Sequence, residues 1–132
     1  VDERGNEHIT MFASEGWWTG DLSSFLTGKP SELYTEAIEE AVVLLISKEN
    51  KERLFQQVPK FERFFRVLYQ NALITQLQRV NQNISMQASE KYRYFQSQYP
   101  LLAQRIPQKN IASFLGITPE FLSIIRRRQL SR

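Results

Sequence analysis

The chain has 132 residues, of which 42% are hydrophobic, 17 are Lys or Arg, 14 are Asp or Glu and none is cysteine. This balance is typical of one globular domain or two small lobes, and the lack of cysteine excludes disulfides, thiol catalysis and cysteine-ligated metal clusters. No apolar run approaches the roughly 20 residues that cross a bilayer, and no signal-peptide pattern opens the chain, so we expect a cytoplasmic protein.

The net charge of +3 conceals a difference between the two halves of the chain. Residues 1–58 contain five Lys or Arg and eleven Asp or Glu, whereas residues 59–132 contain twelve and three. A basic excess of this size makes the second half a candidate for binding a polyanion, although a solvated surface gives the same composition.

Short apolar runs and glycines alternate over residues 1–47. The runs "ITMFA" and "AVVLLIS" are separated by several glycines and by Pro30. This pattern predicts β-strands joined by turns. No glycine occurs between Gly28 and Gly116, which indicates that the architecture changes to helix.

A long helix is predicted from Pro59 to Ile84, because proline is favourable at a helix start and apolar residues recur at helical spacing. The apolar residues make two stripes, so we expect one stripe to pack on the β region and the other on a second copy of the chain. Burial of the whole helix within its own chain is the alternative. The predicted dimer interface consists of Phe61, Phe65, Leu73, Leu77, Val80 and Ile84.

A shorter helix follows Ser85. It carries Tyr92, Phe95 and Tyr99 on one face and stops at Pro100, because proline cannot continue a helix.

The stretch "IASFLGITPEFLSIIRRRQ" predicts two short helices that meet at Gly116. The first helix begins near Gln108, and the glycine supplies a left-handed turn at little cost. Thr118 is a favourable N-cap and Pro119 a favourable first helical residue. A small residue, Ala112, stands where the helices would cross, so the spacing indicates a helix-turn-helix. A corner of two helices that binds no nucleic acid is the alternative.

The outward face of the second helix carries polar and basic residues suited to base edges and phosphates. The predicted DNA-binding residues are Gln108, Lys109, Thr118, Glu120, Ser123, Arg126, Arg127 and Arg128.

The whole chain resembles the Crp/Fnr superfamily of bacterial transcription regulators. The resemblance rests on the order of a glycine-rich region, a long helix, "YPLLAQRIP" and "QKNIASFLGITPEFLSIIRRR". It implies an α+β fold: a partial β jelly-roll barrel related to cyclic-nucleotide-binding domains at residues 1–55, a dimerisation helix at 56–84 and a DNA-binding helix-turn-helix at 85–132. Because the chain starts at Val1 rather than at methionine, we expect the first strands of that barrel to be missing. The partners implied are double-stranded DNA, a second copy of the chain, RNA polymerase and an unknown small-molecule effector, with no membrane.

The segment "WWTGDLSSFLTGKP" is similar to the phosphate cassette of that family. The resemblance therefore implies an effector pocket that includes Gly20, Asp21, Leu22 and Ser31. The arginine that grips a cyclic phosphate in the family is missing, and Glu32 stands near its place. A carboxylate repels phosphate, so we expect no response to cAMP.

The second helix of the helix-turn-helix departs from the family pattern. Relatives often place an arginine at the position of Ile124 and a smaller residue at Phe121, and only "QLSR" follows the arginines, so a wing is short or absent. Two functions stay open: a dimeric transcription regulator, or a ligand-sensing or protein-interaction module that has lost specific DNA binding. No nucleophile and base are paired by spacing, and we expect no enzyme activity, metal or cofactor.

Overall fold

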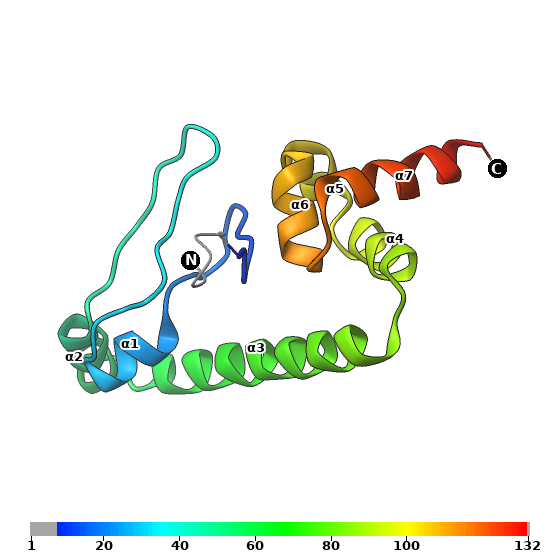
Figure 1. Cartoon of the computed structure of the whole chain (residues 1–132). Coiled ribbons are helices and arrows are strands. Elements are labelled where there is room, and N and C mark those ends of the chain that lie inside the picture. Colours follow the sequence, from blue (N-terminus) through cyan, green and yellow to red (C-terminus); the bar gives the residue numbers. More distant parts are fainter. Residues whose placement is uncertain (1–7, 132) are drawn as a thin grey trace. The chain divides into compact units, whose positions relative to one another are not determined.

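The computed structural model describes residues 8–131, which form seven helices (Figure 1). Helices make up 64% of this part of the chain, and none of its residues lies in a β-strand. The helices are α1 (Leu22–Thr27), α2 (Lys48–Gln57), α3 (Lys60–Ser85), α4 (Ala88–Gln98), α5 (Pro100–Arg105), α6 (Gln108–Leu115) and α7 (Pro119–Leu130).

The predicted α+β fold with a partial β-barrel at residues 1–55 is therefore wrong for residues 8–55, and residues 1–7 lie outside the described part. Helices α1 and α2 lie in the region that was predicted to form strands. Residues 29–46 form a long loop between these two helices (Figure 1). A strand requires a second strand to receive its backbone hydrogen bonds, and the described chain offers none. The side chains of Val42 and Leu44 in "AVVLLIS" are 98% exposed.

The chain divides into two compact units. The first unit, called the C-terminal unit below, comprises the described residues 8–19 and 82–131 and holds α4 to α7. The second unit comprises Gly20–Asn81 and holds α1, α2 and most of α3. Among residues 8–131, no helix combines the length and the apolar character that a membrane span requires.

Helix α1 begins and ends at two local signals in the sequence. The carboxylate Oδ1 of Asp21 accepts a hydrogen bond from the backbone N–H of Ser24 at 3.1 Å, which caps the first turn. Gly28 ends the helix in the left-handed conformation, with φ of 74°. The family resemblance implies a phosphate cassette at these residues, whereas in the structure they satisfy the ordinary rules for a helix start and stop.

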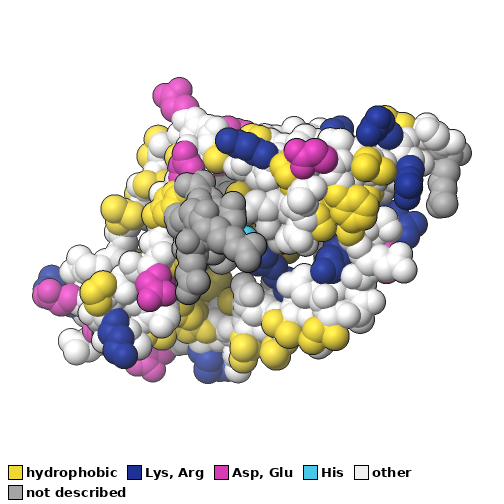
Figure 2. Space-filling view, viewed as in Figure 1, with side chains coloured by type: hydrophobic (Ala, Val, Ile, Leu, Met, Phe, Trp, Pro, Cys, Tyr) yellow, Lys and Arg dark blue, Asp and Glu magenta, His cyan; other side chains and the backbone are white. Residues whose placement is uncertain are grey.

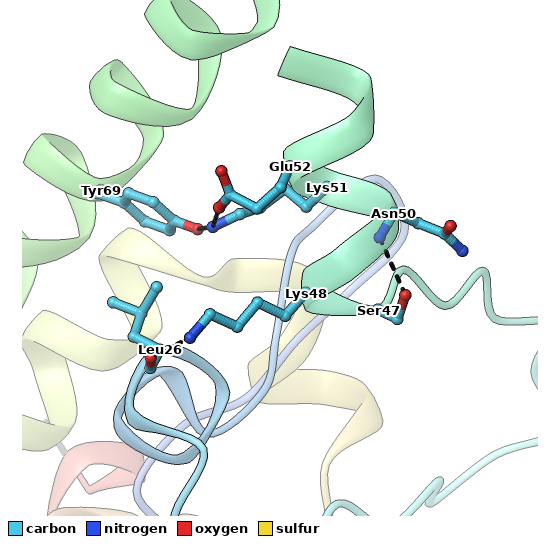
Figure 3. Close-up of polar contacts among 7 residues, drawn as sticks. All are labelled: Leu26, Ser47, Lys48, Asn50, Lys51, Glu52 and Tyr69. Carbon is cyan, nitrogen blue, oxygen red and sulfur yellow. Dashed lines mark hydrogen bonds and ion pairs between the residues drawn. The ribbon is translucent and has the colours of Figure 1, made fainter. Parts of the chain in front are cut away.

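A buried lysine lies at the centre of the Gly20–Asn81 unit. Lys51 on α2 is 3% exposed, and its ammonium nitrogen lies 5.0 to 5.9 Å from the centroids of four aromatic rings. It also lies 3.4 Å from the hydroxyl oxygen of Tyr69 and 3.9 Å from a carboxylate oxygen of Glu52 (Figure 3). The ring faces take the place of water around the charge. We call this set the lysine cage: Lys51, Phe25, Phe55, Phe65 and Tyr69.

The long helix predicted from Pro59 to Ile84 is confirmed as α3. Its residue Phe65 is buried and packs against Phe55 of α2, with ring centroids 5.5 Å apart, so it serves the lysine cage. The apolar stripe further along the helix lies open, and Figure 2 shows hydrophobic side chains gathered along α3. Leu73, Leu77, Val80 and Ile84 are 53 to 81% exposed.

The C-terminal unit has a continuous apolar core contributed by all of its four complete helices. The predicted face of α4 is confirmed, because Tyr92 and Phe95 are 3% and 2% exposed. Pro100 ends α4 as predicted and starts α5 at its first position. The buried core residues are Tyr92, Phe95, Leu102, Ile106, Ile111, Ala112, Leu115, Leu122 and Ile125.

Residues 8–19 form a non-helical segment, with a turn at Glu15–Gly16, that is tied to this core. The ring of Phe12 lies 5.0 Å from that of Phe114 and 6.1 Å from that of Phe95. The backbone N–H of Ile9 donates to the side-chain oxygen of Ser113 on α6 at 3.1 Å. Residues 9 and 12 therefore contact α6, the helix that precedes the turn at Gly116.

Candidate nucleic-acid interface

The two helices and the glycine turn predicted for "IASFLGITPEFLSIIRRRQ" are present. Helix α6 ends at Gly116, whose φ of 71° is in the left-handed region. The N–H of Ile117 donates to the carbonyl of Ala112 at 3.0 Å, which satisfies an end carbonyl of α6. Thr118 then caps α7, because its hydroxyl oxygen accepts from the N–H of Phe121 at 3.2 Å, and Pro119 is the first helical residue.

The inner face of the corner is fully apolar. Ile111, Ala112 and Leu122 are 0% exposed, and Ile125 is 5% exposed. The small side chain of Ala112 lets α6 and α7 approach closely. Burial of these residues fixes which side of α7 points away from the core.

The outer face of α7 follows from the helical period. Successive residues are about 100° apart around the axis, so the face opposite Leu122 and Ile125 carries Glu120, Ile124 and Arg127. All three are exposed. Phe121 lies on one flank of this face and is 45% exposed.

The hydroxyl of Ser123 makes one hydrogen bond within α7. Its oxygen lies 3.0 Å from the carbonyl oxygen of Pro119, to which it donates. The hydroxyl proton is therefore engaged, while the oxygen keeps lone pairs that can accept a hydrogen bond from outside.

The three arginines at the end of α7 are all exposed. They point in different directions because of the helical period, and Arg127 and Arg128 line a shallow depression of about 450 Å³ together with Ile124 and Ser131. Figure 2 shows Lys and Arg side chains beside hydrophobic ones at this end of the molecule. Ser131 was not among the predicted site residues, although its position seven residues after Ile124 places it on the same face.

Of the two predicted DNA-binding residues at the start of α6, one is exposed and one is half-buried. Lys109 is exposed, but Gln108 is half-buried, and its buried side-chain oxygen Oε1 has no hydrogen-bond partner. Lys109 is therefore available to a partner at the surface, whereas the side-chain oxygen of Gln108 is not.

The residues predicted for an effector pocket lie together in the Gly20–Asn81 unit. The hydroxyl of Ser31 donates to Oδ2 of Asp21 at 2.7 Å. This bond, and to a lesser extent the bond from the Ser24 N–H, lowers the pKa of Asp21. Gly20, Leu22 and Ser31 are exposed, so the described residues here form a helix cap on the surface.

No group of histidine, aspartate and glutamate residues within 8–131 is arranged to hold a metal ion. Comparisons of the chain with protein-family models, with curated proteins and with solved structures found no match.

Proposed function

We propose that the C-terminal unit is a DNA-binding domain of the helix-turn-helix type found in Crp/Fnr regulators, and that the protein acts in the cytoplasm as a dimeric transcription regulator. One observation carries the proposal. Helix α7 is anchored by Leu122 and Ile125 so that Glu120, Ile124 and Arg127 lie together on its exposed outer face. A recognition helix enters the major groove with its N-terminal residues on base edges and basic residues near phosphates.

The charge of the same unit supports a polyanionic partner. Its described residues, 8–19 and 82–131, contain seven Lys or Arg and three Asp or Glu. The ion pair between Glu15 and Arg105 uses one charge of each sign, which leaves six basic and two acidic residues. The surface therefore keeps a net positive charge that would attract the DNA backbone.

The dimer is proposed from the open stripe of α3. Leu73, Leu77, Val80 and Ile84 follow a spacing of four, three and four residues, which is the heptad spacing of a coiled coil. A second copy of the same helix is the occupant that this spacing fits. Two copies would present two recognition helices to a palindromic site.

A protein-interaction role is the second candidate, and it rests on the apolar character of Phe121 and Ile124. A salt titration of binding to random duplex DNA separates the two functions. If α7 grips phosphates, the logarithm of affinity falls steeply and linearly with the logarithm of salt concentration.

The variant Arg127→Ala should lower that slope by roughly one per subunit. The matched control is Arg63→Ala, which removes the same charge from an exposed position of α3 in the other unit. If Arg126, Arg127 and Arg128 can all be changed to alanine without loss of affinity or slope, the proposal is overturned and the arginines are a solvated helix end.

A further inference from the structure

We infer that α7 reads thymine methyl groups, through Phe121 and Ile124, in place of guanine edges. This inference rests on the proposed DNA-binding function and specifies which bases that surface recognises.

The first part of the argument is the absence of a donor for guanine. Guanine presents two acceptors, N7 and O6, in the major groove, and it is usually read by arginine or lysine. The residues in the first two turns of α7 that lie on or beside its outer face are Glu120, Phe121, Ser123 and Ile124. None of them has a cationic or amide side chain. Ionised glutamate only accepts hydrogen bonds, and the Ser123 proton is donated to the Pro119 carbonyl at 3.0 Å.

The second part is the presence of two apolar side chains where base contacts are made. Phe121 is 45% exposed and Ile124 is 36% exposed. They are three residues apart on the helix, so their side chains are neighbours. The thymine C5 methyl is the apolar group that a base edge offers in the major groove, and phenylalanine is among its known contacts.

The third part is the charge around these apolar groups. Ile124 shares its depression with Arg127 and Arg128. Two guanidinium groups beside an exposed isoleucine would be poorly matched to the apolar face of another protein helix. They match a major groove, where methyl groups on the floor are flanked by phosphates on both sides. The occupant that satisfies both kinds of side chain is duplex DNA that carries thymine.

The inference is tested with the full 132-residue chain and a duplex that the protein itself selects from a random pool. The second duplex has the same sequence with deoxyuridine in place of thymine in the selected positions, which removes only the methyl groups. We expect selected sites rich in thymine, and an affinity about fourfold lower for each methyl contact that is lost.

Two variants assign the effect to the helix. With Ile124→Ala, thymine and uracil duplexes should differ less than with the unchanged protein, while affinity for the uracil duplex stays the same. Leu130→Ala is the matched control, because Leu130 is an 86% exposed apolar residue in the last turn of α7 and should leave the preference for thymine intact. Ile124→Arg should shift the selected sites toward guanine.

The outcomes separate this inference from the function on which it rests. Salt-dependent binding with equal affinity for thymine and uracil duplexes overturns the inference and leaves the DNA-binding proposal standing. No binding to any duplex at low salt overturns both, and Phe121 and Ile124 then belong to a surface for protein contact.

Discussion

At the scale of single residues, the ion pair between Glu15 and Arg105 joins the non-helical segment 8–19 to α5. Two nitrogens of the guanidinium lie 2.9 and 3.1 Å from the two carboxylate oxygens. These hydrogen bonds, followed by one from the hydroxyl of Ser14, lower the pKa of Glu15 from 4.5 to about 2. The folded protein therefore holds Glu15 ionised at pH values where the unfolded chain binds a proton.

This shift predicts a loss of stability in acid. Because the folded pKa lies below the unfolded one, the contribution is complete above about pH 4.5 and disappears as the pH falls toward 2. The variant Glu15→Gln should lack this part of the pH dependence when melting temperature is measured from pH 2 to 6. Glu32→Gln, at an exposed position, is the control and should melt with the pH dependence of the unchanged protein. A Glu15→Gln variant with that same dependence would contradict the prediction.

The lysine cage predicts a different kind of stability effect. Its ammonium is taken out of water, which costs energy, and the ring faces offset that cost by roughly 2 kcal/mol. Lys51→Ala removes both the stem and the charge from among the rings, and we expect it to destabilise folding by about 2 to 3 kcal/mol.

Lys51→Met separates these two contributions, because methionine keeps most of the stem and removes the charge. Urea unfolding should place Lys51→Met between Lys51→Ala and the unchanged protein. Equal stability of Lys51→Met and Lys51→Ala would show that the stem contributes nothing. Lys60→Met serves as the control, because Lys60 is an exposed lysine of the same unit.

At the scale of elements, α3 has two apolar surfaces with different partners. One is covered within its own unit, where Phe65 packs against Phe55 of α2 and contributes to the lysine cage. The other, the stripe that includes Leu77 and Val80, is open, and both residues are more than half exposed. An exposed apolar stripe along the second half of a helix of 26 residues is a surface that globular proteins ordinarily cover.

Changing Leu77 and Val80 to Asp should therefore abolish dimers, because the seam would bury four unpaired carboxylates across two chains. Sedimentation velocity is the measurement, and we expect a single species with the mass of one chain. Thr75→Asp is the matched control, since Thr75 lies on the opposite side of α3 and is exposed. A dimer that survives both aspartates would assign the stripe to another partner.

At the scale of the whole molecule, dimerisation and DNA binding make one joint prediction. Sites selected by the protein should contain two inverted half-sites about one helical turn apart, because a two-fold dimer presents its recognition helices symmetrically. Insertion of 5 base pairs between the half-sites should reduce the affinity to that of a single half-site. The Leu77→Asp, Val80→Asp variant should not distinguish the two spacings, and equal binding to both by the unchanged protein would argue against a two-fold complex.

The sequence by itself determined the helices whose signals are local. Thr118, Pro119 and Gly116 lie within a few residues of the bonds they control, so the α6–α7 corner and its outer residues could be predicted residue by residue. The same holds for the buried face of α4, which follows from helical spacing alone. Asp21 and Gly28 carry equally local signals for α1, although the family resemblance implies a phosphate cassette in their place.

Only the tertiary structure decided what depends on partners far apart in the sequence. The ion pair of Glu15 joins residues 90 positions apart, and the bond from Ile9 joins residues 104 positions apart. The burial of Lys51 requires rings from three helices, whereas its composition alone predicts an exposed residue. The conformation of residues 29–46 also depends on distant partners. Their apolar runs are typical of a strand, but a strand forms only where a second strand accepts its backbone hydrogen bonds.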